Sequence, residues 1–153
     1  MVSARRRAAG FTLPELMTVV AIIALLSGLA APSFSQMINA QRTKGAASDL
    51  FTALTRARSE AIKRNTEVSL TPAGSGWQGG WSIPNPADTG NKLDDHGPLT
   101  ALTVTGPASV VYLANGRLKG AAAPSFRLAA GSATARCIRI DLSGRPYQTS
   151  TAC

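Results

Sequence analysis

The sequence predicts an α+β fold, in which one long N-terminal helix packs on a C-terminal β-rich head. A run without charged residues extends from Leu16 to Gln41, and a pattern with helical period continues it as far as Arg64. From Glu67 apolar and polar residues alternate, which is the period of a strand. Glycine and proline are plentiful after Pro72, which is typical of a loop-rich β domain.

The first part of the helix has the properties of a membrane anchor. With its flanks, the apolar stretch is long enough to cross a bilayer, and we place the membrane part at about residues 13–35. The arginines at positions 5–7 precede it, so the positive-inside bias puts the N-terminus in the cytoplasm and the head outside. Pro32 predicts a kink. Glu15 lies at the edge of the span, where a carboxylate is costly and requires a functional reason.

The second part of the helix has an apolar face and a charged face, and Asn65 is the expected stop. The apolar face consists of Ala47, Leu50, Phe51, Leu54, Ala57, Ala61 and Ile62. The charged face consists of Arg42, Lys44, Asp49, Arg56, Arg58, Glu60, Lys63 and Arg64. At 1.5 Å per residue this helix is roughly 78 Å long, far more than a bilayer needs. Its second half therefore packs on the head, and the charged face is either solvated or a partner surface.

Alternation and turn residues predict the strands of the head. We expect strands at 68–72, 99–105, 109–113, 125–129 and 137–142. A short strand should also follow Trp81, and residues 147–149 should return beside the strand at 137–142. Asn115-Gly116 predicts a hairpin turn. In the strand at 137–142 the two isoleucines and Leu142 should face one way and Arg139 the other. Trp77 and Trp81 are either packing residues or a binding platform.

The polar stretch at 84–98 is interpreted as a loop, with His96 in solvent. A calcium site formed by its carboxylates is an alternative, but their spacing fits no EF-hand. The two cysteines, Cys137 and Cys153, lie in the part expected outside the cytoplasm, where a pair predicts a disulfide. It would close a loop of about 17 residues and contribute about 3 kcal/mol. Two free thiols or a metal pair are the alternatives, and a zinc site lacks donors.

No residue pattern in the sequence indicates catalysis. The chain contains one histidine and none of the G-x-S-x-G, H-E-x-x-H or Walker motifs. Cys137 as a nucleophile would need a base, and His96 is the only imidazole. We therefore predict a protein that is not an enzyme, with no catalytic residues, no metal and no cofactor.

The N-terminal residues Gly10, Phe11 and Glu15, with the hydrophobic helix behind them, resemble the class III signal of type IV pilins and type II secretion pseudopilins. The resemblance implies a leader, residues 1–10, that prepilin peptidase cleaves after Gly10, and N-methylation of Phe11. Pro14 departs from the usual branched aliphatic residue, but a proline in the first helical turn is tolerated. The alternative is an ordinary secretory signal peptide, which would leave Ala31 as the mature N-terminus.

Later segments resemble the GspH/FimT/FimU family of minor pilins and pseudopilins. The matching segments are 46–50, 57–64, 68–70, Trp77, Gly80-Trp81 and 139–145. This resemblance implies a pilin-like fold, with an N-terminal helix at 11–65 and a periplasmic, sandwich-like antiparallel head at 66–153. It implies a non-catalytic subunit, anchored in the inner membrane and assembled near the tip of a type IV pilus that serves twitching or DNA uptake. A minor pseudopilin of a type II secretion system is the alternative.

The implied partners are other minor and major pilins or pseudopilins, with Glu15 pairing with the Phe11 amine of a neighbour. Some members of the family bind DNA through a basic Gly-Arg-x-Arg stretch, of which Gly144-Arg145 retains only the first arginine. The net charge is +8, and the segment 113–153 is strongly basic. Its candidate DNA contacts are Arg117, Lys119, Arg127, Arg136, Arg139 and Arg145. Such a surface can bind phosphates without reading sequence, and a solvated basic face is the alternative.

Overall fold

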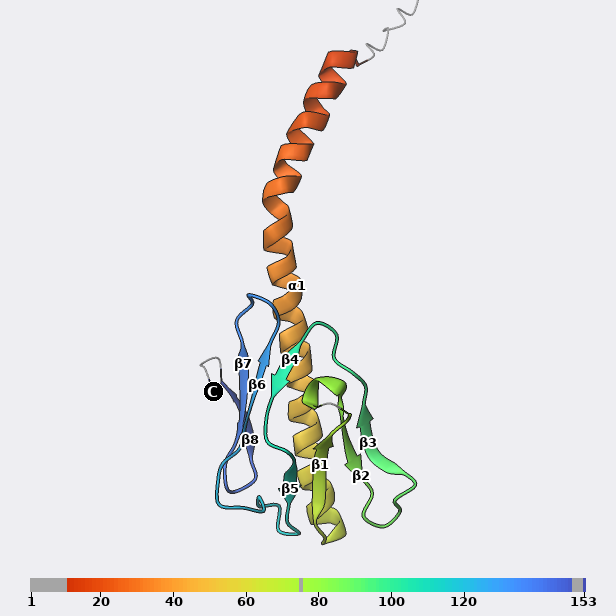
Figure 1. The fold of residues 1–153 in the computed structure, drawn as a ribbon, viewed down its shortest axis with the longest axis vertical. Coiled ribbons are helices and arrows are strands. Elements are labelled where there is room, and N and C mark those ends of the chain that lie inside the picture. Colours follow the sequence, from red (N-terminus) through yellow and green to blue (C-terminus); the bar gives the residue numbers. More distant parts are fainter. Residues whose placement is uncertain (1–10, 75, 150–152) are drawn as a thin grey trace, which may run out of the picture. The chain divides into compact units, whose positions relative to one another are not determined.

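The computed structural model describes residues 11–74, 76–149 and 153, and for residues 29–32 it describes the backbone only (Figure 1). The predicted leader and its cleavage site at Gly10 lie outside these residues. The side chain of Pro32 also lies outside them, so the kink there stays a prediction. The chain divides into two compact units, Met1–Ser35 and Gln36–Cys153. Every buried apolar side chain of the described residues belongs to the second unit, which therefore has a complete core of its own.

The helix α1 (Leu13–Arg64) has the bounds predicted from the sequence. It stops at Asn65, which adopts a left-handed conformation with φ of 51°. The N–H of Asn65 donates to the carbonyl of Ile62, and the N–H of Thr66 donates to the carbonyl of Ala61. These two bonds form a Schellman motif, which satisfies carbonyls that the end of a helix would otherwise leave unpaired.

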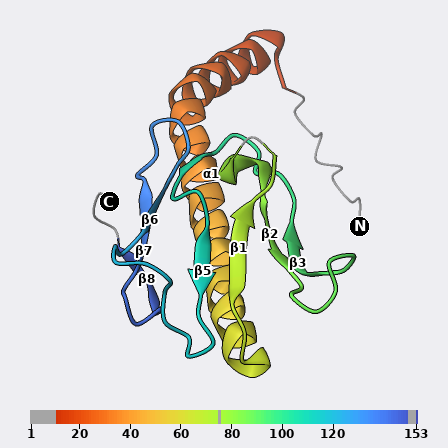
Figure 2. The ribbon, with the colours of Figure 1, turned by 60° about the horizontal axis from the view of Figure 1, so that its bottom comes forward.

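The head contains two four-stranded antiparallel sheets that lie along the second half of α1 (Figures 1 and 2). The first sheet has the order β3 (Lys92–His96), β2 (Trp81–Pro84), β1 (Val68–Pro72) and β5 (Val110–Tyr112). The second has the order β4 (Thr103–Thr105), β6 (Ser125–Ala129), β7 (Arg136–Ile140) and β8 (Pro146–Thr149). A short 3-10 helix, η1 (Trp77–Gly79), connects β1 to β2. The predicted α+β class with an antiparallel head is confirmed.

The helix buries one face against both sheets. Its buried residues are Ala46, Ala47, Leu50, Ala53, Leu54, Ala57 and Ala61. Five of the predicted face residues are therefore joined by two further alanines, which allow the strands to approach closely. The prediction is wrong at Ile62, which is 51% exposed. Ile62 lies at the rim, where its Cδ1 faces the turn at Gly116. Phe51 is only partly buried.

Side chains on the inner faces of the sheets complete the core. They are Val68, Leu70, Trp81, Ile83, Val110 and Tyr112 in the first sheet, and Val104, Phe126, Leu128, Ile138 and Ile140 in the second. Trp77 is also buried; its indole N–H donates to the carbonyl of Pro107 at 2.6 Å, and its ring meets that of Phe126 edge-on. Both tryptophans therefore act in packing, and the binding platform is not formed.

Three strand predictions need correction. The polar stretch at 84–98 is not simply a loop, because Lys92–His96 forms β3 by pairing with β2. Of the stretch 99–105 only Thr103–Thr105 is a strand, since Leu99 and Leu102 pack against the core from a loop. β7 ends at Ile140, and the turn that follows interrupts the alternation of inward-facing and outward-facing side chains. Leu142 is consequently 43% exposed instead of facing inward with the isoleucines.

The hairpin predicted at Asn115-Gly116 is confirmed. The N–H of Leu113 donates to the carbonyl of Arg117 at 2.8 Å, and Tyr112 pairs with Leu118 across the turn. Gly116 adopts the positive φ that this turn requires, 76°. The segment that follows the turn thus runs beside β5 at the edge of the first sheet.

Candidate functional site

Glu15 lies in the first turn of α1. Its Oε2 accepts a hydrogen bond of 3.4 Å from the N–H of Thr12, while the carbonyl of Thr12 accepts one from Leu16. This is one half of a capping box, and a carboxylate is favourable at the positive end of a helix. The spacing Thr12-x-x-Glu15 is the sequence signal for this cap, and it was missed. Glu15 therefore has a local role at the start of the helix in addition to any role in a contact with a partner.

The first unit exposes a continuous series of apolar side chains. Those outside residues 29–32 are Phe11, Leu13, Leu16, Met17, Val19, Val20, Ile22, Ile23, Leu25, Leu26 and Phe34. A surface of this kind requires cover from lipid or from another protein. Among the described residues no single helix qualifies as a membrane span by length and composition; Leu13–Gly28 and Ser33–Arg64 qualify only together, as one broken span.

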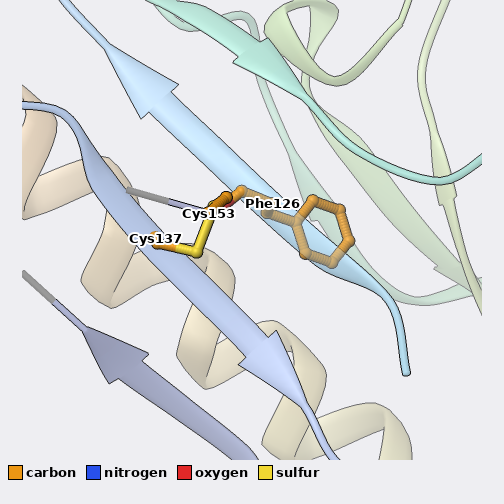
Figure 3. The surroundings of a disulfide bond; sticks show 3 residues. All are labelled: Phe126, Cys137 and Cys153. Atoms are coloured by element: carbon orange, nitrogen blue, oxygen red, sulfur yellow. A yellow bond between two sulfur atoms is a disulfide. The ribbon is translucent and has the colours of Figure 1, made fainter. Parts of the chain in front are cut away.

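Cys137 and Cys153 form the predicted disulfide (Figure 3). Their Cα atoms are 5.3 Å apart, and Sγ of Cys153 lies 3.0 Å from the carbonyl oxygen of Phe126. In the register of the second sheet, Cys137 is opposite Arg127 and therefore on the face away from the buried Phe126 and Ile138. The disulfide consequently attaches the C-terminus to the outer face of this sheet.

Removal of this disulfide by Cys153→Ser is expected to lower the free energy of unfolding of residues 36–153 by about 3 kcal/mol, because the unfolded chain gains the entropy of an open loop. Urea unfolding monitored by circular dichroism measures the change. Dithiothreitol should destabilise the wild type by a similar amount and leave Cys153→Ser unaffected. Equal stability of the wild type with and without the reductant would contradict the expected role.

The six basic residues predicted to contact DNA are distributed over both sheets. Arg127 in β6 and Arg139 in β7 are exposed on the outer face of the second sheet, as diagonal neighbours. Arg139 is also opposite Tyr147 of β8. Arg136 is opposite Leu128, whose side chain is buried, so it belongs to the inner register and is only half exposed. We refer to Arg127 and Arg139 as the outer-face pair.

The other three basic residues lie in or just after the two turns that follow β5 and β7. Arg117 and Lys119 flank the buried Leu118 just after the first turn, and Arg145 lies in the second. Lys119 forms an ion pair of 2.8 Å with Glu67. Among the described residues, the ion pairs include neither residue of the outer-face pair, nor Arg117 or Arg145.

The turns at 113–117 and 141–145, which we call the double turn, lie against each other. A Cβ added to Gly144 would overlap the carbonyl oxygen of Gly116, so the two backbones touch. Arg58 donates through Nε to the carbonyl of Gly116 at 3.0 Å and through Nη2 to the carbonyl of Ser143 at 3.3 Å. Tyr112 is buried beside them, and burial raises the pKa of its phenol. Within the described part of the chain its hydroxyl has no hydrogen-bond partner.

The prediction that the charged face of the helix is either solvated or a partner surface is wrong at Arg58. This residue is half-buried and binds both turns, because it stands at the border of the apolar face, where the helix meets the two sheets. The signal was present in the sequence: Arg58 continues the four-residue spacing from Leu54 to Ile62.

Asp141 stabilises the second half of the double turn. Its Oδ1 accepts hydrogen bonds from the hydroxyl of Ser143 and the N–H of Arg145. The bond from Ser143 is the main reason why the pKa of Asp141 lies below the usual value of 3.8, and the bond from Arg145 lowers it further.

We expect a carboxyl NMR titration to give Asp141 a pKa below 3.8, and Ser143→Ala to move it back toward that value. Because the folded pKa is the lower one, the carboxylate contributes stability above the unfolded pKa, and this contribution is lost as the pH falls through the folded value. Asp88, whose pKa is lowered chiefly by the hydrogen bond from Asn91, is a reference carboxylate whose pKa Ser143→Ala should leave unchanged. An unaltered Asp141 titration in Ser143→Ala would contradict the assignment.

A further cluster joins α1 to β3. His96 stacks on Trp81, with ring centroids 4.1 Å apart, and its Nε2 lies 3.5 Å from a carboxylate oxygen of Asp49. Arg56 pairs with Asp94 at 3.0 Å. The prediction of a solvated His96 is therefore wrong. In the part of the chain that the structure describes, no group of three His, Cys, Asp or Glu side chains could hold a metal ion.

Comparisons with known proteins agree with this architecture. The family model described as type II transport protein GspH matches residues 46–144, and the prokaryotic N-terminal methylation motif matches residues 5–31. The chain belongs to the GspH family. No curated protein matches the sequence significantly.

Two crystal structures of the type IV minor pilin FimU of Pseudomonas aeruginosa, strain PAO1, are similar to this GspH-family chain. One has 24% sequence identity and a TM-score of 0.62, covering 76% of this chain and 92% of that one. The other has 25% identity and a TM-score of 0.61, covering 69% and 91%. The predicted pilin-like fold and family are thereby confirmed.

The family and the motif define a minor pilin or pseudopilin, a type of structural and non-catalytic subunit. The methylation motif implies processing by prepilin peptidase, anchoring in the inner membrane and assembly with other pilins.

Proposed function

We propose that this chain is a non-catalytic minor pilin of a type IV pilus that is incorporated near the tip of the fibre. The observation that carries the proposal is the similarity in fold to FimU, which extends over 91–92% of the FimU chains. The alternative is a minor pseudopilin of a type II secretion system, which the description of the matching family model favours.

Deletion of the gene distinguishes these two machines. A minor pilin near the tip is needed for fibre assembly, so we expect few or no surface pili and no twitching, with normal export of secreted enzymes. A culture that keeps its pili but loses secreted enzymes would refute the pilus and support the pseudopilin.

Within this function, Glu15 is proposed to pair with the Phe11 amine of a neighbouring subunit. Glu15 is exposed, and the bond to Thr12 uses only one of its two carboxylate oxygens. A carboxylate at the edge of a membrane span is best relieved by a fixed positive charge. The methylation motif supports cleavage before Phe11, which would create such a charge.

Glu15→Gln is the sharpest test of this role, because glutamine keeps an oxygen for the N–H of Thr12 and removes only the charge. We expect Glu15→Gln and Glu15→Ala to accumulate in the membrane and to be absent from sheared fibres, as judged by immunoblot. Thr12→Ala, which leaves the carboxylate intact, is the matched control and should be incorporated. Incorporation of Glu15→Gln at the wild-type level would refute the charge pairing.

We also propose a second function, binding of DNA by the head. The supporting observation is that the outer-face pair is exposed and belongs to none of the ion pairs among the described residues, so both guanidinium groups are available to phosphates. Tyr147, which lies beside Arg139 and is 41% exposed, could stack on a base.

Fluorescence anisotropy with a labelled oligonucleotide over a salt series tests this function. Arg139→Gln should weaken binding and reduce the slope of log K against log salt by about 1, because one phosphate contact is lost. Lys92→Gln removes the same charge from β3, which lies in the other sheet, and is the matched control. Absence of binding by the wild type at low salt would refute the proposal, and identical slopes for Arg139→Gln and Lys92→Gln would exclude the outer face as the site.

A further inference from the structure

Arg58 connects two turns that are distant from it in sequence. Its acceptors, the carbonyls of Gly116 and Ser143, lie 58 and 85 residues further along the chain. One turn belongs to the first sheet and the other to the second. A guanidinium group can bind both at once because it presents several N–H donors in a rigid, planar arrangement. The side chain thus joins the two sheets at the end of α1.

The contact between the turns brings the backbone positions of two other arginines, Arg117 and Arg145, close together. Gly116 and Gly144 both have positive φ, 76° and 83°, and their backbones touch. Arg117 follows the first glycine and Arg145 follows the second, so the double turn presents these two exposed side chains from adjacent backbone positions. In sequence they are far apart, and only the close approach of the turns makes them neighbours.

The double turn therefore concentrates positive charge. Arg58 donates to neutral carbonyls, which do not compensate its charge. The nearby carboxylate of Asp141 interacts electrostatically with Arg145, but it is a single negative charge against the three arginines Arg58, Arg117 and Arg145. Like charges held together repel each other, and an oxyanion such as a phosphate, which accepts from guanidinium groups in bidentate fashion, would relieve that repulsion.

We propose that Arg58 is a positioning residue for a phosphate site formed by Arg117 and Arg145. By holding the two turns together it sets the distance between these guanidinium groups, so that neighbouring phosphates of one nucleic acid strand can be bound. This inference rests on the proposed DNA binding by the head and adds the double turn to the outer-face pair as a second contact region.

The test uses the full chain in a non-ionic detergent and a labelled oligonucleotide, with Arg58→Lys as the central variant. Lysine keeps the charge but cannot bridge two carbonyls with a planar fork. If Arg58 acts through geometry, Arg58→Lys weakens binding about tenfold, a loss within the range of coupling between interacting residues. The loss should disappear when Arg145→Gln is already present, since the site is then incomplete.

Two further measurements distinguish a positioning role of Arg58 from a general loss of folding. Combined with Arg127→Gln, which lies on the outer face, Arg58→Lys should still cost the full tenfold, because sites without shared partners are additive. Circular dichroism confirms that each variant is folded, and a merely unfolded variant would lose binding in both backgrounds. Wild-type affinity of Arg58→Lys, or equal losses with and without Arg145, would overturn the positioning role while leaving DNA binding intact. A wild type that binds no DNA would instead overturn the DNA proposal itself, and this inference with it.

Discussion

Gly144→Ala is expected to destabilise the head by about 2–5 kcal/mol. The residue has φ of 83°, where a side chain costs roughly 1–2 kcal/mol, and its new Cβ would overlap the carbonyl oxygen of Gly116. That oxygen belongs to backbone, so the two turns must separate, at a cost of about 1–3 kcal/mol that is typical of overpacking. Urea unfolding of residues 36–153, whose core is complete, measures the loss.

Two other glycines act as controls for this prediction. A Cβ at Gly97 meets no atom within 4 Å, so Gly97→Ala should change stability little. Gly116 also has positive φ, but its Cβ would meet chiefly the end of the flexible Ile62 side chain. Gly116→Ala should therefore cost less than Gly144→Ala. Equal losses at these two positions would show that backbone strain alone decides, and that the turns do not hold each other in place.

Elements with strong local signals could be predicted from the sequence. The helix has a continuous period and a left-handed stop at Asn65, so its bounds follow from residues within a few positions of each end. The strand at Ser125–Ala129 alternates cleanly, and the disulfide follows from two cysteines in the part of the chain that the sequence predicts to lie outside the cytoplasm. In each case the residues that make the signal also make the contacts.

Edge strand β3 could not be predicted in this way. Its residues are mostly charged, and only Leu93 packs against the core. The strand exists because β2 offers it a row of unpaired backbone groups, which is a contact between segments and leaves no periodic signal. For the same reason His96 was misplaced: its stacking on Trp81 depends on the register between the two strands.

The candidate DNA-binding residues show what a count of charges misses. Strand alternation correctly placed Arg139 away from the buried isoleucines, and Arg127 follows the same rule in β6. Which strands are adjacent, however, decides whether two arginines are neighbours, and only the contact between the turns brings Arg117 of the first sheet close to Arg145 of the second. The four-residue spacing from Leu54 to Ile62 places Arg58 at the border of the apolar face, but it does not show that the acceptors are backbone carbonyls of two distant turns.

Phe126→Ala is expected to lower the free energy of unfolding by about 3–5 kcal/mol, which is the usual cost of deleting a buried aromatic ring. Phe126 is fully buried on β6 and meets the ring of Trp77 edge-on, with centroids 4.7 Å apart. It lies in the second sheet, while Trp77 belongs to the segment that connects β1 to β2 in the first. Loss of the ring therefore weakens the contact between the two halves of the core. Urea unfolding of residues 36–153 measures the change.

Tyr147→Ala removes an aromatic ring of similar size from the exposed face of the same sheet and is the matched control. Since a surface substitution usually changes stability by no more than about 0.5 kcal/mol, the two variants should differ by several kcal/mol. A double-mutant cycle between Phe126 and Trp77 should also give a coupling of about 0.5–1.5 kcal/mol, the range for aromatic pairs. Additive losses would mean that the two rings pack independently, and that the sheets are held together chiefly by α1 and by the double turn.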